Sequence, residues 1–190
     1  MFHKNSNVIY SGALFIGAIL LALFIKAYLV QPYIVDGQSM EPTLHNSDRL
    51  IVDKLPHTIA RINNHAYIPK RGDIIIFNQD NLPGYTGSKQ LVKRVIGLPG
   101  DKVVVNNGFI AIYNKANQKG FNPDKTVGYK ITAPYTGGDV NITLGTNQLF
   151  VCGDNRGNSE DSRYFGPIDS SQVVGKLSLR VWPIGHAEHF

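Results

Sequence analysis

Hydrophobic residues are distributed in two different ways along the chain. From Val8 to Ile25 the sequence runs for 18 consecutive residues without a charged side chain. As a helix this stretch would measure roughly 27 Å, at about 1.5 Å per residue, which is close to the thickness of a bilayer's hydrocarbon core. Tyr10 and Tyr28 lie near its ends, where aromatic side chains are favoured, and Lys26 can extend to the interface. The pattern predicts a single transmembrane anchor.

Two other interpretations of this segment are less favoured. A cleavable signal peptide would have a shorter apolar core followed by an Ala-x-Ala site, and no such site follows here. A buried helix of a soluble core would usually be shorter and more amphipathic. Lys4 and the α-amine flank one side of the segment and Lys26 the other. The positive charges are therefore nearly balanced and do not orient the anchor.

After Gln31-Pro32 the hydrophobic residues occur in short, β-branched runs separated by turn residues. No long segment with a helical period follows the anchor. We predict a mainly β protein, in which residues 1–30 form a short tail and the anchor and residues 31–190 form one all-β domain. The expected strands are Tyr33–Val35, Leu50–Leu55, Asp73–Phe77, Gln90–Ile96, Lys102–Val105, Phe109–Tyr113, Gln148–Cys152 and Lys176–Trp182. Residues 114–147, rich in Asn, Gly, Lys and Thr, are expected to form a variable surface region.

Composition and charge limit which partners and cofactors the protein can have. Charged residues make up 17%, below the roughly 25% of typical globular domains, as an apolar anchor would cause. The net charge is +5, but no more than two basic residues are adjacent, so a surface beside anionic lipid fits better than nucleic-acid binding. A single cysteine, Cys152, excludes an intramolecular disulfide and a cysteine-based zinc site. No metal site or cofactor is predicted.

The first motif that carries candidate chemistry is the segment from Asp36 to Leu44. It follows an extended stretch, and its Gly37 and Pro42 favour a tight, exposed turn. A serine on such a turn, Ser39, can present its hydroxyl to a substrate. Taken alone, a serine in this position more often caps a turn than acts as a nucleophile.

The second motif runs from Lys93 to Asp101. On a strand, Lys93 would share a face with Leu91 and Val95, and desolvation there would lower its pKa. A lysine with an ordinary pKa of about 10.4 can act as a base at pH 7 only at a cost of roughly 4.6 kcal/mol. Lowering its pKa to about 8 would remove roughly 3 kcal/mol of that cost. The alternative is an edge-strand lysine that discourages aggregation. The six histidines show no Ser/His/Asp or metal-ligand spacing, so a serine hydrolase here would need this lysine as its base.

The third motif runs from Gly153 to Gly166 and is dense in hydrogen-bonding side chains. It follows a predicted strand, and such a loop suits the scaffold of a functional site. A calcium-binding loop is the alternative, but the segment lacks the spacing and the final glutamate of an EF-hand.

Together, and in this order behind an anchor, these motifs resemble the bacterial type I signal peptidase family. The resemblance rests on the anchor and on four segments: Ser39–Thr43, Arg71–Phe77, Lys93–Asp101 and Gly153–Arg163. It implies a membrane-bound serine endopeptidase with a Ser/Lys dyad, on an all-β scaffold of coiled antiparallel sheets. Gly37 stands two residues before the nucleophile, where some members carry a serine of the oxyanion hole, and this indicates the Gram-positive-like branch. The oxyanion donors would then be backbone amides, including that of Ser39.

The resemblance also implies a role for each matching residue. Ser39 would attack the scissile carbonyl and neutral Lys93 would act as the base. Ser159 matches the serine that hydrogen-bonds and orients the lysine, and ion-paired residues that hold the site together are matched by Asp154, Asp161, Arg163 and Arg94. We expect an extended peptide to bind as an added strand against residues 33–37 and 90–93. Its contacts would include Val35, Gly37, Met40 and Val92, with Val35, Met40 and Val92 forming the walls of small-residue pockets.

The resemblance further implies substrates, partners and a compartment. The substrates would be secreted preproteins, cut after small-x-small sites such as Ala-x-Ala. The enzyme would lie in the plasma membrane near the secretion translocase, with its catalytic domain on the extracytoplasmic side. Two alternatives differ in kind. One is a self-cleaving Ser/Lys peptidase of the repressor type. Such chains carry a DNA-binding head and an internal Ala-Gly bond, whereas this chain has an anchor and no Ala-Gly pair. The other is an anchored β domain that binds signal peptides or pilin-like partners without cutting them.

Overall fold

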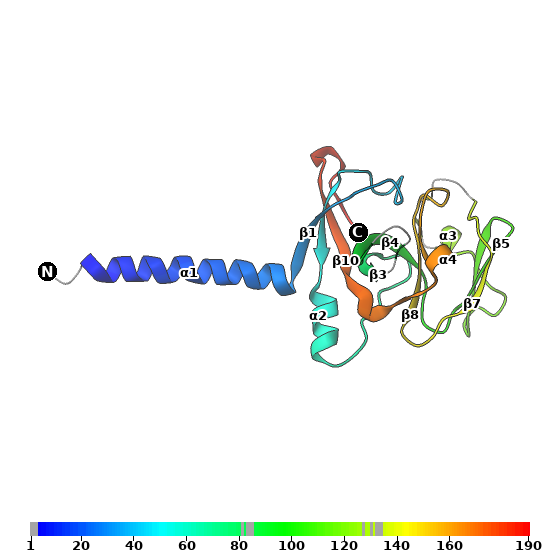
Figure 1. Cartoon of the computed structure of the whole chain (residues 1–190), viewed down its shortest axis with the longest axis horizontal. Coiled ribbons are helices and arrows are strands. Elements are labelled where there is room, and N and C mark those ends of the chain that lie inside the picture. The colour runs from blue at the N-terminus through cyan, green and yellow to red at the C-terminus, as the bar shows by residue number, and fades with distance from the viewer. Residues whose placement is uncertain (1–3, 81, 83–85, 127, 130, 132–134) are drawn as a thin grey trace.

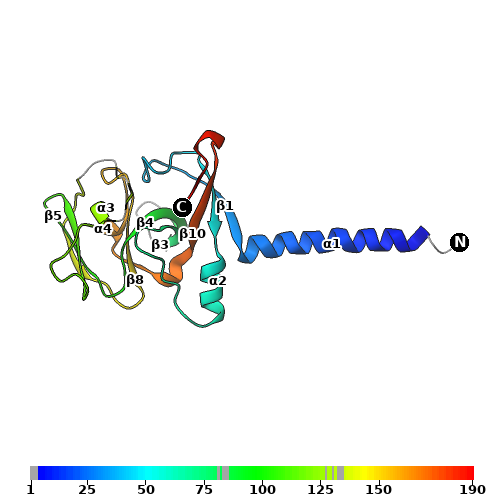
Figure 2. The same ribbon diagram turned by 180° about the vertical axis from the view of Figure 1, so that it is seen from behind.

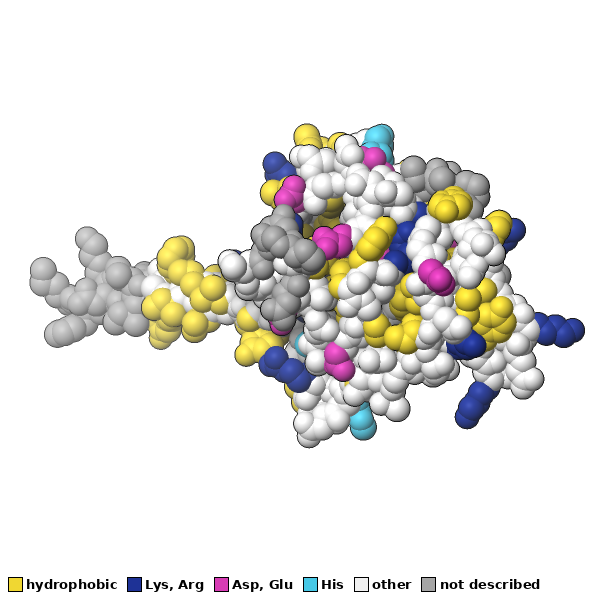
Figure 3. Space-filling view, turned by 45° about the vertical axis from the view of Figure 1, so that its right-hand side comes forward, with side chains coloured by type: hydrophobic (Ala, Val, Ile, Leu, Met, Phe, Trp, Pro, Cys, Tyr) yellow, Lys and Arg dark blue, Asp and Glu magenta, His cyan; other side chains and the backbone are white. Residues whose placement is uncertain are grey.

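A long helix, α1 (Lys4–Tyr28), projects away from the rest of the molecule (Figure 1). The computed structural model describes residues 4–80, 82, 86–126, 128–129, 131 and 135–190. Within these ranges α1 contains the one helical segment, Tyr10–Tyr28, that is long and apolar enough to cross a membrane. None of this segment is buried against the rest of the chain, and its hydrophobic side chains are exposed (Figure 3). A helix with this surface is suited to lipid and not to a soluble core.

The rest of the described chain is built from antiparallel strands. The larger sheet has eight strands within the described residues, in the order β1-β2-β10-β3-β4-β8-β9, with β11 paired to β10. A three-stranded sheet, β6-β5-β7, lies at the end far from α1 (Figure 2). The bounds are β1 (Val30–Ile34), β2 (Arg49–Asp53), β3 (Ile74–Asp80), β4 (Ser88–Gly97), β5 (Lys102–Asn106), β6 (Phe109–Tyr113), β7 (Val140–Thr143), β8 (Gln148–Cys152), β9 (Ile168–Asp169), β10 (Val173–Trp182) and β11 (Glu188–His189). The prediction of a mainly β fold of antiparallel sheets is confirmed.

Three groups of buried side chains hold the sheets together. One fills the space between the three-stranded sheet and β8, and includes Val103, Ile110 and Phe150. A second lies along β3, β4 and β8, and a third lies beneath the segment that carries Ser39. Burial of each large side chain contributes about 1.5–3 kcal/mol. These buried clusters hold the strands in place, and the strands in turn position the loops between them.

The prediction of a strand over Leu50–Leu55 is wrong at the C-terminal end of that range. Strand β2 stops at Asp53, and a short helix, α2 (Leu55–Ile62), follows at once. Pro56 explains the change, because proline has no N–H for a sheet but is tolerated in the first turn of a helix. The Asp53 carboxylate also accepts a hydrogen bond from the Leu55 N–H at 2.8 Å. This helix was not predicted from the sequence.

The stretch 114–147, expected to be a variable surface region, contributes more than a loop. It contains β7, which pairs with β5 from Val105↔Val140 to Lys102↔Thr143. It also contains the short helix α3 (Pro123–Thr126). The only apolar residues of β7 are Val140 and Ile142, too few for an alternating pattern to stand out in the sequence.

Candidate active site

Ser39 is carried by the loop between β1 and β2, which is tied to itself by backbone hydrogen bonds. Val35 N–H donates to Asp48 O and Ser47 N–H to Val35 O, each at 2.9 Å. Gly37 has φ of +101°, a conformation that side chains rarely adopt, so the turn requires glycine there. Its N–H donates to Asn46 Oδ1 at 2.9 Å. The loop therefore holds Ser39 half-buried at its tip.

Lys93 lies on β4 opposite Ile75 of β3, and its side chain is only 3% exposed. Its Nζ lies 2.8 Å from Ser39 Oγ and also donates to Val92 O at 3.0 Å. Burial lowers the pKa of Lys93 from 10.5 to about 8, and the nearby Asp161 carboxylate opposes that shift. The two residues are 54 positions apart in sequence. The fold thus joins a hydroxyl to an amine that is partly neutral near pH 8.

The polar loop after β8 supports the Ser39 loop from the other side. Asn155 N–H donates to Ser39 O at 3.0 Å, and the Asn155 side-chain amide donates to Gln38 O at 3.2 Å. A side chain at Gly153 would collide with Ser39 O and Ser159 Oγ. Only glycine therefore permits this close approach of the two loops.

A buried ion pair joins β4 to the same polar loop. Arg94 donates from Nε to Asp154 Oδ1 at 2.8 Å and from Nη2 to Asp154 Oδ2 at 2.5 Å. Asp154 also accepts the Thr43 hydroxyl at 2.6 Å, which ties in the loop of Ser39. The Arg94 guanidinium lies over the Tyr129 ring at 4.2 Å from its centre. Arg94 and Asp154 were both expected to take part in ion pairs that hold the site together, and the structure pairs them with each other. Together with Thr43 they join all three motifs found in the sequence.

Asp161 and Arg163, the other two residues expected in such ion pairs, also pair with each other. Arg163 donates to both Asp161 oxygens, each at 2.8 Å, and both side chains are buried. The Ser159 hydroxyl donates to Asp161 Oδ2 at 2.7 Å. In the described structure Ser159 makes no hydrogen bond to Lys93, contrary to expectation, because Lys93 Nζ donates to Ser39 Oγ and Val92 O instead. Ser159 is thus tied to the Asp161–Arg163 pair.

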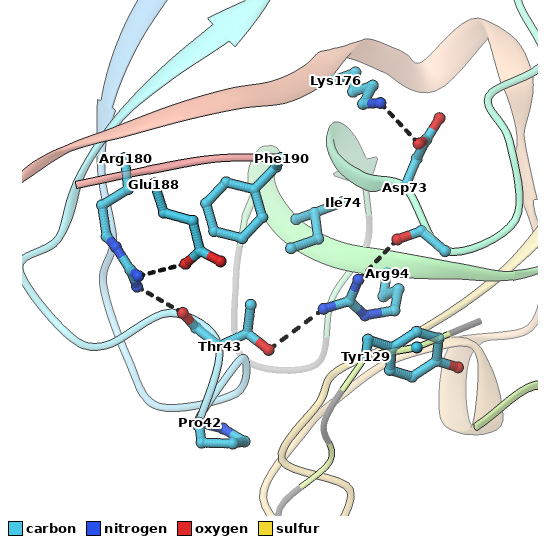
Figure 4. Close-up of a pocket in the computed structure, with 12 residues that line it drawn as sticks. Pro42, Thr43, Asp73, Ile74, Arg94, Tyr129, Lys176, Arg180, Glu188 and Phe190 are labelled. Carbon is cyan, nitrogen blue, oxygen red and sulfur yellow. Dashed lines mark hydrogen bonds and ion pairs between the residues drawn. The ribbon is translucent and has the colours of Figure 1, made fainter. Parts of the chain in front are cut away.

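Arg180 of β10 also fixes the Ser39 loop, and the sequence analysis did not identify it. It donates to Thr43 O at 2.7 Å and to Glu188 Oε2 at 2.7 Å (Figure 4). These groups line a cavity of about 550 Å³ that also includes Arg94 and Lys176. Neither Ser39 nor Lys93 lines this cavity. No sequence signal could have found Arg180, since Thr43 is 137 residues away.

A second, smaller hollow contains Ser39 and Lys93. It measures about 180 Å³ and is lined by Ser39 and Lys93, by Tyr33–Asp36, by Lys89–Val92, and by Leu50 and Ile76. Val35 and Val92 are among these residues, as expected of pocket walls. Met40 is not: it is 1% exposed and packs in the core under the loop. Gly37 does not line the hollow either, so neither Met40 nor Gly37 forms part of its wall.

The hollow that contains Ser39 and Lys93 lies in a groove between two strand edges, those of β1 and β4. Residues Ser88–Lys93 of β4 pair with β3 on one side, while β8 pairs with β4 only from Arg94 onward. Strand β1 pairs with β2 alone among the described strands. Unpaired N–H and C=O groups along such edges can accept an added strand. Within the described ranges, no group of three or more His, Cys, Asp or Glu side chains is placed to hold a metal ion.

Comparison with known proteins places this site in a family. The model of the family described as signal peptidase, peptidase S26, matches residues 8–182. The chain belongs to this family. The family predicted from the motifs is thereby confirmed, and with it the prediction of an enzyme of the signal peptidase I type.

Two relatives from other organisms agree with this assignment. Signal peptidase I of Bacillus caldolyticus is 36% identical over 155 residues, covering 79% of this chain and 78% of that protein. A probable signal peptidase I-2 of Synechocystis is 35% identical over 153 residues, covering 79% of this chain and 62% of that protein. A crystal structure of a signal peptidase I from Enterococcus faecalis is 31% identical, covers 58% of this chain and 97% of that one, and has a TM-score of 0.41.

Proposed function

We propose that the chain is a membrane-anchored serine endopeptidase that removes signal peptides from secreted preproteins with a Ser39/Lys93 dyad. The observation that carries the proposal is the 2.8 Å contact between Ser39 Oγ and the buried Lys93 Nζ, in a groove with open strand edges. A buried amine of lowered pKa can act as a base without histidine. Membership of the signal peptidase family supports the substrate class.

The reaction proceeds in two proton-transfer cycles through Lys93. Neutral Lys93 takes the proton from Ser39 as Oγ bonds to the scissile carbonyl carbon. The resulting ammonium delivers that proton to the leaving amine, and the C–N bond breaks to leave an ester on Ser39. Lys93 then takes a proton from water as the water oxygen attacks the ester. Return of that proton to Oγ as the ester C–O bond breaks releases the product as a carboxylic acid, which ionises in water, and restores the serine.

Backbone amides stabilise the oxyanion in this proposal. The Ser39 N–H donates to no acceptor among the described residues, which leaves it free for a substrate oxygen. The Gly37 N–H is engaged by Asn46. We therefore assign the Ser39 amide as a donor to the oxyanion and leave Gly37 the role of shaping the turn.

The groove suits a substrate bound in an extended conformation. The peptide lies between the edge of β1 and residues 88–93 of β4, and its small side chains face Val35 and Val92. A hollow of about 180 Å³ accepts alanine-sized groups more readily than large ones. This supports cleavage after small-x-small sequences. We propose that the catalytic domain lies on the side of the membrane where secreted proteins emerge.

The activity should rise with pH between about 6 and 9. Because Lys93 must be neutral to accept the proton, kcat/KM is expected to be half-maximal near the pKa of about 8 and to fall roughly tenfold per pH unit well below it. Initial rates with a soluble Ala-x-Ala peptide would give this profile. A profile that is flat, or that falls with rising pH in this range, would contradict Lys93 as the base.

Enlarging the groove should relax its preference for small residues. In Val35→Ala, the space left by the two methyl groups is expected to raise cleavage of substrates with Val or Leu at a selected position, relative to Ala, by about tenfold. Competition between peptide pairs would measure this ratio. Met40→Leu is the matched control, because Met40 is in the core beneath the groove and its change should leave the ratio unaltered. An unaltered ratio in Val35→Ala would remove Val35 from the pocket.

Product mapping tests the proposed function directly. The detergent-solubilised full chain would be incubated with a preprotein that has an Ala-x-Ala site, beside its Ser39→Ala variant. Mass spectrometry should find a single cut after the second alanine for the parent enzyme and none for the variant. Binding of the preprotein without cleavage by the folded parent would favour the non-cutting module instead.

A further inference from the structure

Tyr129 stacks on the guanidinium of Arg94, although it belongs to the stretch 114–147 that was expected to be a surface region. The guanidinium carbon lies 4.2 Å from the centre of the Tyr129 ring. Figure 4 shows the ring beside Arg94 in the larger cavity, which both residues line. The ion pair that Arg94 makes with Asp154 is shielded from solvent, since the two side chains are 7% and 0% exposed. An arginine on an aromatic face is attracted by the quadrupole of the ring, most strongly where water is excluded.

Asp124, in the short helix α3, holds the Tyr129 ring in place. The Tyr129 hydroxyl donates to Asp124 Oδ1 at 2.7 Å. Burial and the nearby Asp124 carboxylate raise the pKa of Tyr129, so its hydroxyl stays protonated and remains a donor at neutral and mildly alkaline pH. Asp124 is itself fixed, because Arg156 donates to both of its oxygens, at 2.6 and 2.5 Å, and both side chains are buried. A ring bonded to a buried ion pair has little freedom to leave Arg94.

The stacked ring is connected to the loop of the nucleophile through Arg94. The Thr43 hydroxyl accepts a hydrogen bond from Arg94 Nη2 at 3.3 Å and donates to Asp154 Oδ2 at 2.6 Å. Thr43 follows Ser39 within the same loop. Displacement of the guanidinium would therefore release the side-chain bonds that hold this part of the loop.

Asp124 is connected to Ser39 by a second route. Arg156, its ion-pair partner, donates from Nε to Gly153 O at 3.0 Å. Gly153 lies so close to Ser39 O that a side chain at position 153 would collide with it. The segment that carries Asp124 and Tyr129 thus supports the nucleophile loop through two arginines at once.

We infer that Tyr129 and Asp124 are positioning residues, which act through Arg94 and Arg156 to hold Ser39 at its distance from Lys93. The inference rests on the proposed function and adds to it two residues outside the groove. The 2.8 Å contact between Ser39 Oγ and Lys93 Nζ depends on where the loop lies. A misplacement of about 1 Å at a reacting group can cost about a hundredfold in rate. The stretch 114–147 is then part of the apparatus that makes the dyad work.

Kinetics of ring variants test this role in the full chain in detergent. Tyr129→Leu is expected to lower kcat for an Ala-x-Ala peptide by about tenfold, with KM changed less than about twofold, because the walls of the groove are intact. Tyr129→Phe preserves the aromatic face and should retain at least about half of the parental kcat. Tyr135→Leu is the matched control, since Tyr135 lies in the same stretch and is 64% exposed, and it should retain full activity.

Three results of this series would overturn the inference. One is parental kcat in Tyr129→Leu, including the case in which only its thermal midpoint falls, which would show a purely structural role. Another is an equal loss of kcat in Tyr129→Phe and Tyr129→Leu, which would exclude stacking as the cause. The third is a rise in KM without a fall in kcat. If Tyr129→Leu does not fold, Tyr129→Met gives the same comparison, because methionine fills the space with a flexible apolar chain.

A double variant tests whether the ring acts through Thr43. Thr43→Val removes the hydroxyl that joins Arg94 and Asp154 to the nucleophile loop. In this background Tyr129→Leu should lower kcat by less than about threefold, because residues that act along one route are not additive. A full further tenfold loss would overturn the connection through Thr43.

Amide hydrogen exchange tests the positioning without catalysis, in a Ser39→Ala background. The N–H groups of Thr43 and Leu44 both donate to Met40 O at 2.9 Å, and their exchange reports how firmly the loop is held. Tyr129→Leu should raise their exchange rates several-fold, whereas Tyr135→Leu should leave them unchanged. Unchanged exchange in Tyr129→Leu would overturn the inference. Faster exchange in an enzyme whose parent cuts no preprotein would contradict the proposed function alone.

Discussion

Ser39→Ala and Lys93→Met are each expected to lower kcat by about 10⁴-fold or more, while the domain stays folded. Ser39 supplies the bond-forming oxygen, and Lys93 is the amine placed 2.8 Å from it. Loss of either group from a nucleophile–base pair removes most of the rate enhancement. Methionine fills the space of the lysine stem without burying an ammonium, so the thermal midpoint of Lys93→Met should equal or exceed that of the parent.

Two matched variants control this prediction. Ser178→Ala on β10 and Lys102→Met on the exposed side of β5 remove the same groups away from the groove and should retain full activity. A double variant, Ser39→Ala with Lys93→Met, should be no slower than either single variant, because the two residues act as a unit. Turnover within tenfold of the parent by either single variant would end the assignment of a dyad.

Asp154→Ala is expected to cause the largest loss of stability, about 3–5 kcal/mol, because it leaves the Arg94 guanidinium buried without its counter-charge. Asp154 is fully buried and also accepts the Thr43 hydroxyl, so the loop of Ser39 should loosen as well. For a domain of this size, that loss corresponds to a fall in the unfolding midpoint of roughly 10 °C. Thermal unfolding of the full chain in detergent would measure it.

The control for charge removal is Asp139→Ala, since Asp139 is exposed and should shift the midpoint by less than about 2 °C. Combining Asp154→Ala with Arg94→Met should restore part of the lost stability, because the uncompensated buried charge is then absent. If Asp154→Ala were as stable as the parent, the pair would not hold the three motifs together. A loss of activity without a loss of stability would instead indicate direct contact of Asp154 with the substrate.

Short-range features of the sequence were sufficient for the anchor and most strands. The uncharged run from Val8 to Ile25 predicts α1 because hydrophobic length alone decides whether a helix can span a bilayer. Alternation along segments such as 109–113 predicts strands because successive side chains face opposite sides of a sheet. The family, and with it the candidate nucleophile and base, could also be read from short motifs.

Only the tertiary structure decided which side chains meet. Arg180 reaches the Ser39 loop because β10, which is distant in sequence, lies beside β2 in the sheet. The conformation of the loop after β8 brings the Ser159 hydroxyl to Asp161, two residues away. Met40 lies within the nucleophile motif yet faces the core, since the turn at Gly37 sets the direction of each following side chain.

The same distinction applies to α2 and to the lysine. A proline marks the start of that helix in the sequence, but the exposure of its apolar residues Leu55, Ile59 and Ile62 is decided by how the helix packs beside the end of α1. The sequence placed Lys93 among apolar neighbours and so gave the direction of its pKa shift. The magnitude depends on how completely the surrounding loops exclude water, and that is a property of the assembled fold.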